Sequence, residues 1–121
     1  MRSCAKTKTS KFLCHAAVQA TLSVIGGKWK PLILWHLLER RLRFGELQKS
    51  LNGISQKILA NELKRLEKSG VIHRKLYHQV PPKVEYWITS YGLTLRPVLE
   101  KLADWGGAHR PRAARAQAAK K

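Results

Sequence analysis

The sequence predicts an α+β fold, mostly helical, with a small β-hairpin wing and a helix at each end of one domain. Three observations predict it. Apolar residues recur at helical spacing over most of the 121 residues. Glycines at positions 26–27, 53 and 70 divide this pattern into separate helices, because glycine readily takes the left-handed conformation found at helix ends. Two β-like runs flank Pro81-Pro82, which cannot lie inside a paired ladder.

Two helices are expected before residue 40. Residues 16–25 carry an apolar stripe at helical spacing, formed by Val18, Leu22 and Ile25. Residues 31–39 follow, with Pro31 in the first turn, where a missing N–H costs nothing. This second helix is apolar around most of its circumference, so we expect it to be central.

A helix-turn-helix is expected next. Residues 41–43 alternate like a short strand, and residues 44–51 form a helix that ends in the tight turn 52–54. Ser55 is a suitable N-cap for a longer helix that reaches about Ser69 and stops at Gly70. Helix, glycine-containing turn and longer helix together are the helix-turn-helix pattern.

The hairpin that follows makes this a winged helix-turn-helix. Residues 71–77 and 83–88 are the strands, and we expect Glu85 to pair with Arg74 or Lys75 across them. The last helix is expected from about residue 89 to residue 106. Pro97 should kink or split it, and its apolar stripe comprises Leu95, Val98, Leu99, Leu102 and Trp105.

Charge is the main global signal. The chain has 24 basic and 7 acidic residues, a net charge of +17. Residues 1–13 are expected to form a flexible basic arm and residues 108–121 a basic disordered tail. Residues 14–107, the expected domain, still hold 15 basic and 7 acidic residues, a net charge of +8. A basic domain attracts polyanions: DNA, RNA or an anionic membrane.

Other classes of protein have little support. The longest apolar run is too short to cross a membrane and no signal-peptide cleavage pattern is present, so we expect a cytoplasmic protein. The cysteines and histidines lack metal-ligand spacing. Neither a phosphate-binding loop nor an activated nucleophile is recognisable. The sequence therefore indicates no cofactor, no metal and no enzyme.

The helix from residue 55 to residue 69 is the expected DNA-reading element. On a helical wheel, Ile58, Leu59, Leu63 and Leu66 share the inner side. The opposite side is basic and polar, and a major groove admits such a helix. Amides can bond adenine and lysines can contact guanine or phosphate, so the candidate DNA-binding residues are Ser55, Gln56, Lys57, Ala60, Asn61 and Lys64. The alternative is an ordinary solvated face.

The wing supplies further candidates. Lys75, His78 and Lys83 cluster near its tip, where such residues usually touch phosphates or the minor groove. A structural hairpin that never meets DNA is the alternative. Base stacking is not expected, because the aromatic residues do not line up on one sheet face as an RNA-stacking platform requires.

The chain resembles the HxlR-type transcription regulators, bacterial relatives of the MarR winged-helix proteins. The resemblance runs from Cys14 to Trp105 and rests on these segments: Ile25-Gly26-Gly27-Lys28-Trp29, Arg43-Phe44, Glu46-Leu47, Gly53-Ile54-Ser55, Leu59, Leu63 to Leu66, Gly70, Pro81-Pro82-Lys83-Val84-Glu85-Tyr86, Thr89, Gly92, Leu95, Pro97 and Trp105. It implies a homodimer that binds operator DNA.

Two functional expectations follow. We expect a two-fold dimer on a near-palindromic operator, joined through the apolar residues Val18, Leu22, Ile25, Leu99, Leu102 and Trp105. A general RNA- or nucleic-acid-binding protein without operator specificity is the alternative, although A-form major grooves do not admit a helix. A second alternative is an enzyme or interaction module that does not bind DNA.

Cys14 is the candidate sensor of oxidants or electrophiles. It should lie at the start of the first helix, where backbone N–H groups and the helix dipole stabilise a thiolate. Cys4 could act as a resolving thiol. The resemblance adds that some such regulators sense quinone-like electrophiles, although His15 stands where the family often has proline. The alternatives are a packed cysteine and a non-covalent small-molecule inducer.

Overall fold

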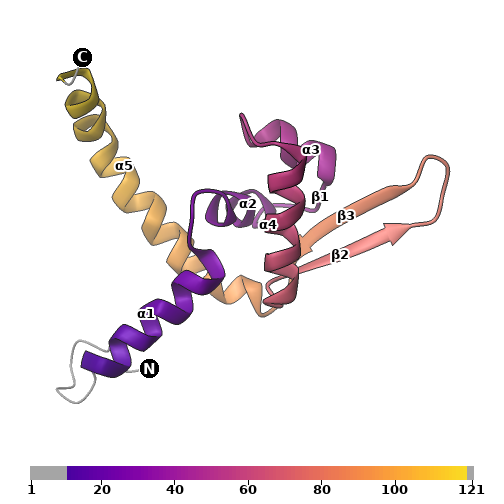
Figure 1. Ribbon diagram of the computed structural model, residues 1–121, viewed down its shortest axis with the longest axis horizontal. Coiled ribbons are helices and arrows are strands. Elements are labelled where there is room, and N and C mark those ends of the chain that lie inside the picture. The colour runs from indigo at the N-terminus through magenta and orange to yellow at the C-terminus, as the bar shows by residue number, and fades with distance from the viewer. Residues whose placement is uncertain (1–10, 120–121) are drawn as a thin grey trace.

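The computed structural model describes the backbone of residues 11–119 and the side chains of residues 14–110. Its elements, in chain order (Figure 1), are α1 (Lys11–Ile25), α2 (Lys30–Leu37), β1 (Leu42–Arg43), α3 (Phe44–Ser50), α4 (Gln56–Lys68), β2 (Ile72–Tyr77), β3 (Lys83–Ile88), the short 3₁₀ helix η3 (Gly92–Leu95) and α5 (Arg96–Ala119). The predicted α+β fold is confirmed.

The core is enclosed by α2, α3, α4 and one face of the sheet. Helix α2 is central, as its all-round hydropathy predicts, with Ile33, Leu34 and Leu37 buried. The same core includes Leu47 of α3, Leu59, Leu63 and Leu66 of α4, and Ile72 of β2. These side chains hold the two helices of the helix-turn-helix in a fixed relation to the hairpin.

The three strands form one antiparallel sheet in the order β1-β3-β2. Tyr86 of the central strand is opposite Leu42 on one side and Arg74 on the other. Side chains alternate between the two faces of a sheet, so Leu42, Ile72 and Tyr86 share the inner face, where all three are buried. The outer face carries the intervening positions: Arg43, His73, Lys75, Tyr77, Lys83, Glu85 and Trp87.

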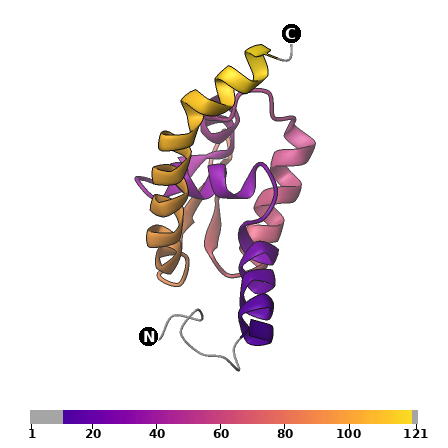
Figure 2. The same ribbon diagram turned by 90° about the vertical axis from the view of Figure 1, so that its left-hand side faces the viewer.

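Helices α1 and α5 project from the body on the side opposite the hairpin and diverge from each other (Figures 1 and 2). The structure extends both beyond their expected bounds. Helix α1 already begins at Lys11, where the sequence predicts an arm, and α5 continues to Ala119 through the expected tail. The alanine-rich segment after residue 112 has high helix propensity, which favours this extension. Residues 1–10 of the expected arm lie outside the described residues.

Pro97 splits the last helical segment, as expected. It is the second residue of α5, and η3 precedes that helix. Among the described residues, no helix has the length and hydropathy needed to cross a membrane. Within the same part of the chain, no three potential ligands among His, Cys, Asp and Glu lie together as a metal site would require.

Candidate nucleic-acid interface

Helix α4, the second helix of the expected helix-turn-helix, is bounded at both ends by local sequence. At its start, the Ile58 backbone N–H donates a hydrogen bond of 3.1 Å to the Ser55 hydroxyl oxygen, which confirms the predicted N-cap. The preceding turn contains Gly53 with φ +86°, and the helix is followed by Gly70 with φ +81°. Both values lie in the left-handed region that favours glycine. Helices α3 and α4 therefore form the predicted helix-turn-helix.

The solvent face of α4 matches most of the predicted DNA-binding residues. Gln56, Lys57, Asn61 and Lys64 are exposed, Ala60 is half-buried, and Ser55 is exposed with its hydroxyl engaged in the cap. One assignment on the helical wheel is wrong. Ile58, expected inside, is 43% exposed. The whole first turn of α4 is exposed, and the buried stripe begins only at Leu59, so this turn extends beyond the core.

Sequence reasoning missed Arg74 as part of this face. Arg74 comes from β2 and lines a shallow depression of about 420 Å³ together with Ala60, Lys64 and Glu67 of α4. It therefore continues the surface of the recognition helix onto the hairpin. The alternation of β2 could have found it, because Arg74 shares the face of the buried residue Ile72.

Two of the predicted wing residues lie on the opposite face. Lys83 alternates along β3 with Glu85 and Trp87, and Lys75 pairs with Glu85, so both lysines belong to the outer face of the sheet. His78 lies in the connection at the tip of the hairpin and is exposed. The structure thus brings Gln56, Lys57, Asn61 and Lys64 together, whereas it separates Lys75 and Lys83 from them.

Glu85 has partners other than the expected ones. Its carboxylate accepts a 2.9 Å hydrogen bond from the Tyr77 hydroxyl and lies 3.5 Å from the Lys83 ammonium. The Tyr77 hydrogen bond, followed by the Lys83 charge, lowers the pKa of Glu85. The expected pairing with Arg74 or Lys75 is wrong. Arg74 points to the other face, and the Lys75 ammonium lies over the Tyr77 ring, 4.9 Å from its centroid.

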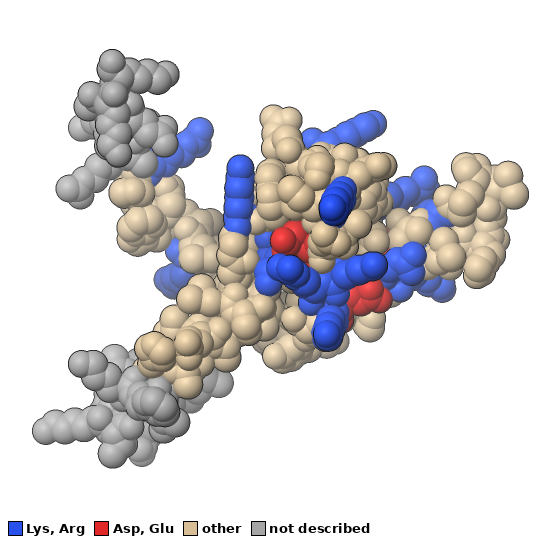
Figure 3. All heavy atoms as spheres, in the orientation of Figure 1, with Lys and Arg blue, Asp and Glu red and all other residues tan. Residues whose placement is uncertain are grey.

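Basic side chains dominate the face that carries α4. In Figure 3, Lys and Arg side chains gather over α4 and the adjoining strands, around smaller acidic patches. A duplex backbone carries one negative charge for each phosphate, and such a surface attracts it at long range. Both the exposed position of α4 and the positive charge around it therefore suit contact with a nucleic-acid duplex.

A second surface, formed by α1 and α5, is apolar. Val18 and Leu22 of α1 are 58% and 56% exposed, and Leu102 and Trp105 of α5 are 51% and 68% exposed. Ile25 and Leu99, expected to join them in an interface, are instead buried within the single chain. They occupy the parts of α1 and α5 that meet the body, so they contribute to its core.

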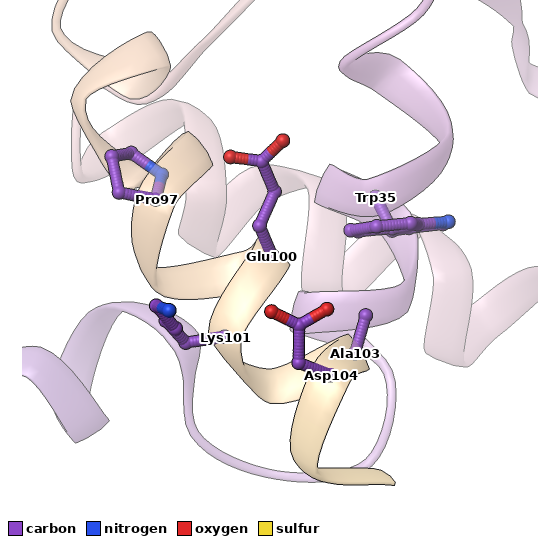
Figure 4. Close-up of a pocket in the computed structure, with 6 residues that line it drawn as sticks. All are labelled: Trp35, Pro97, Glu100, Lys101, Ala103 and Asp104. Carbon is purple, nitrogen blue, oxygen red and sulfur yellow. The ribbon is translucent and has the colours of Figure 1, made fainter. Parts of the chain in front are cut away.

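The groove between α2 and α5 adjoins this surface. Trp35 and Leu102 line one hollow of about 340 Å³. A neighbouring hollow of about 460 Å³ carries Glu100 and Asp104, one turn apart on α5, facing Trp35 of α2 (Figure 4). Both hollows lie between α2 and α5, and neither is lined by a residue of α4. The first is apolar, whereas the second also carries charged side chains.

Cys14 is the fourth residue of α1 and is a half-buried free thiol. It lies within the first turn of the helix, as predicted, and His15 beside it is exposed. Cys4, the predicted second thiol, lies outside the described residues.

Comparison with known proteins agrees with this architecture. The model of the HxlR-like helix-turn-helix family matches residues 24–114. The chain is 47% identical over 104 residues to the uncharacterized HTH-type transcriptional regulator YdeP of Bacillus subtilis, a match that covers 86% of this chain and 81% of YdeP.

Two solved regulators are similar in structure. The redox regulator HypR in its reduced form has a TM-score of 0.75 and 44% identity, covering 78% of this chain and 93% of HypR. The reduced form of the transcriptional regulator YodB from B. subtilis has a TM-score of 0.66 and 32% identity, covering 74% of this chain and 88% of YodB. The chain therefore belongs to the HxlR-like helix-turn-helix family and is a transcriptional regulator of the HxlR and MarR type.

Proposed function

We propose that this regulator is a two-fold dimer that binds a near-palindromic duplex operator, with α4 of each subunit in a major groove. The observation that carries the proposal is the solvent face of α4, where Gln56, Lys57 and Asn61 are exposed in the first turns and Lys64 follows. Residues in the N-terminal part of a recognition helix reach base edges.

Each side chain of this face has a chemical role in the proposal. The amides of Gln56 and Asn61 form paired hydrogen bonds with adenine, and Lys57 bonds guanine or phosphate. Ala60, being small and half-buried, lets the helix approach the groove closely. Lys64 and the neighbouring Arg74 hold the phosphate backbone, and His78 at the hairpin tip meets the flanking minor groove.

Selection of bound genomic fragments would identify the operator, and point variants would then test the face. Asn61→Ala and Gln56→Ala should each weaken the free energy of operator binding by roughly 1–3 kcal/mol and lower the preference for the operator over other sequences. Lys64→Ala should weaken binding to the operator and to random duplex alike. It should also reduce the slope of log affinity against log salt concentration by about 1. Lys28→Ala, at an exposed lysine in the turn before α2, is the matched control and should leave binding to both duplexes unchanged. If both Asn61→Ala and Gln56→Ala bound the operator as wild type does, α4 would not be the helix that contacts the bases.

Competition distinguishes this function from general RNA binding. The proposed contacts need a B-form major groove, whereas the A-form groove of double-stranded RNA is too deep and narrow for a helix. Unlabelled double-stranded RNA should therefore fail to displace the operator at concentrations at which unlabelled operator succeeds. Equal displacement by both would favour the general nucleic-acid-binding alternative.

We further propose that Cys14 senses oxidants or electrophiles. HypR is described as a redox regulator, and YodB has been solved after treatment with diamide. In this chain, Cys14 is a half-buried thiol on α1, the helix that also carries exposed Val18 and Leu22. With a quinone, the thiolate sulfur would form a C–S bond to the ring, and the ring would take up a proton. The added group would then shift α1 within the dimer.

Operator binding before and after treatment with a quinone tests the sensor. Treatment should release wild-type protein from DNA and leave Cys14→Ser bound. Cys4→Ser is a second variant to compare. A direct adduct at Cys14 does not require Cys4, whereas a disulfide between the two thiols does. Equal binding of treated and untreated wild type would mean that the inducer is a non-covalent small molecule or another signal.

A further inference from the structure

The outer face of the sheet carries aromatic and basic side chains that the α4 interface does not use. Strand alternation places Trp87 of the central strand β3 beside His73 of β2, and Tyr77 beside Lys83. Sequence reasoning excluded a stacking platform because the aromatics did not line up on one face. The register shows that Tyr77, Trp87 and His73 do share a face.

Each large ring on this face has cationic neighbours. The Arg41 guanidinium carbon lies 4.2 Å from the Trp87 ring centroid, and the His73 ring is 5.4 Å away on the other strand. The Lys75 and Lys83 ammonium groups each lie 4.9 Å from the Tyr77 centroid. Aromatic rings therefore alternate with positive charges along the hairpin and onto its junction with β1.

The face is strongly basic as a whole. Arg41, Arg43 and Lys75 are exposed, and the acid among them, Glu85, is already bound by Lys83 and Tyr77. The free positive charge of Arg41, Arg43 and Lys75 therefore favours an anionic partner. The rings favour one that also has flat, unsaturated groups.

We propose that this outer sheet face is a second nucleic-acid site and that it binds single-stranded nucleic acid. Bases stack on Trp87 and Tyr77, while Arg41, Arg43 and Lys75 hold the phosphodiester backbone. An unpaired strand fits these requirements because only unpaired bases offer their faces to a flat surface. Arg41 precedes β1 and is exposed, so its guanidinium can leave the Trp87 ring for a phosphate when a base takes its place.

The proposed site is separate from the duplex interface. Arg74, which adjoins Lys64 of α4, points to the opposite face of the same strand from His73 and Lys75. One hairpin can thus contribute to both sites through alternate residues. The inference does not depend on α4 reading an operator, and the two are tested with different ligands.

Binding of labelled oligothymidine and oligouridine of roughly twelve nucleotides, followed by fluorescence anisotropy, tests the proposal. Trp87→Leu and Tyr77→Leu should each weaken single-strand binding roughly ten-fold, since one stacked base contributes an effect of this order. Tyr91→Leu is the matched control, because Tyr91 is an exposed ring, 62% accessible, that lies after β3 and outside the sheet. Arg41→Ala should weaken binding and reduce its salt dependence, whereas Lys28→Ala, at an exposed lysine before α2, should not.

Binding of genomic duplex by the same variants separates the two sites and reports on folding. Duplex affinity should stay unchanged in Trp87→Leu and Tyr77→Leu. Single-strand binding by Trp87→Leu equal to that of Tyr91→Leu would overturn the proposal. A parallel loss of duplex binding in correctly folded Trp87→Leu and Tyr77→Leu would also overturn it, since the face would then be an extension of the duplex interface.

Discussion

Thr89 joins the end of the recognition helix to the start of the C-terminal segment. Its hydroxyl donates a 2.7 Å hydrogen bond to the Gly70 carbonyl oxygen and accepts a 2.8 Å bond from the Gly92 N–H. The Thr89 N–H in turn donates to the Val71 carbonyl oxygen. A Cβ at Gly92 would collide with that same Val71 carbonyl, so the two segments approach as closely as their backbones allow.

Thr89→Val should destabilise the protein by about 1–3 kcal/mol, because an isosteric methyl leaves the Gly70 carbonyl and the Gly92 N–H without their partner. Urea unfolding measures the loss. Thr89→Ser keeps the hydroxyl and should restore much of the stability. If serine and valine destabilised the protein equally, packing of the threonine methyl and not the hydrogen bonds would be the cause.

Glu46 gives the stability a defined acid dependence. The Arg43 N–H donates a 2.8 Å hydrogen bond to its carboxylate, and the Arg40 guanidinium lies 3.6 Å away. The backbone hydrogen bond and, after it, the Arg40 charge lower the pKa of Glu46 from its ordinary value of 4.5. Because the pKa of Glu46 is lower in the folded state, its contribution to stability is complete above about pH 4.5. That contribution is lost as the pH falls through the pKa of the folded state.

Glu46→Gln should therefore be less stable than wild type at pH 7 and should approach it as the pH falls below about 4.5. Urea midpoints measured from pH 7 to pH 3 test this. Glu39→Gln, at an exposed residue just before the same segment, is the matched control. A gap between wild type and Glu46→Gln that stays constant over this range would show that ionisation of Glu46 does not contribute.

Helix α4 illustrates how an element is limited by its ends. Ser55 satisfies one of the N–H groups that the first turn leaves without a helical partner, and Gly70 provides the left-handed residue after the last turn. The cap also sets where the exposed first turn begins, and with it the position of Gln56 and Lys57.

Ser55→Ala should lower the free energy of unfolding by about 1 kcal/mol through loss of the cap. Ser55→Asp should retain most of it, because a carboxylate accepts the same N–H and suits the helix dipole. Thermal unfolding of both variants measures the difference, with Ser50→Ala as a control at a serine outside the N-cap position. An alanine variant as stable as wild type would mean that water replaces the hydroxyl at no cost.

The apolar surface of α1 and α5 concerns the whole molecule. Val18, Leu22, Leu102 and Trp105 are more than half exposed in the single chain. Of these, Leu102 also lines the α2–α5 groove, together with Leu32 and Trp35. Apolar surface of this extent is characteristic of a surface that another protein covers.

Leu22→Glu combined with Trp105→Glu should therefore convert the proposed dimer into a monomer, because each charge would be buried without a partner in the interface. Sedimentation at micromolar concentration measures the mass. Val80→Glu is the matched control, since Val80 is fully exposed at the hairpin tip, away from α1 and α5. A wild-type protein that sediments as a monomer would contradict the dimer directly.

The order of the elements followed from the sequence, because local rules decide it. Helical spacing, the Ser55 cap and the Gly70 stop predicted α4, and the Pro81-Pro82 pair predicted the hairpin connection. The exposed face of α4 followed as well, since Gln56, Lys57, Asn61 and Lys64 are opposite the buried stripe on a simple helical wheel.

Tertiary structure decided which faces those elements present. The sheet register placed Lys75 and Lys83 on the face away from Arg74, and it put Trp87 and Tyr77 on one shared face. Alternation along a strand shows which residues share a face, but not which of the two faces meets the core. Packing against the body buried Ile25 and Leu99, while Ile58, with the same periodicity as its buried neighbours, was left exposed. A periodic pattern identifies a stripe, but the position of the neighbouring elements determines where burial of that stripe begins and ends.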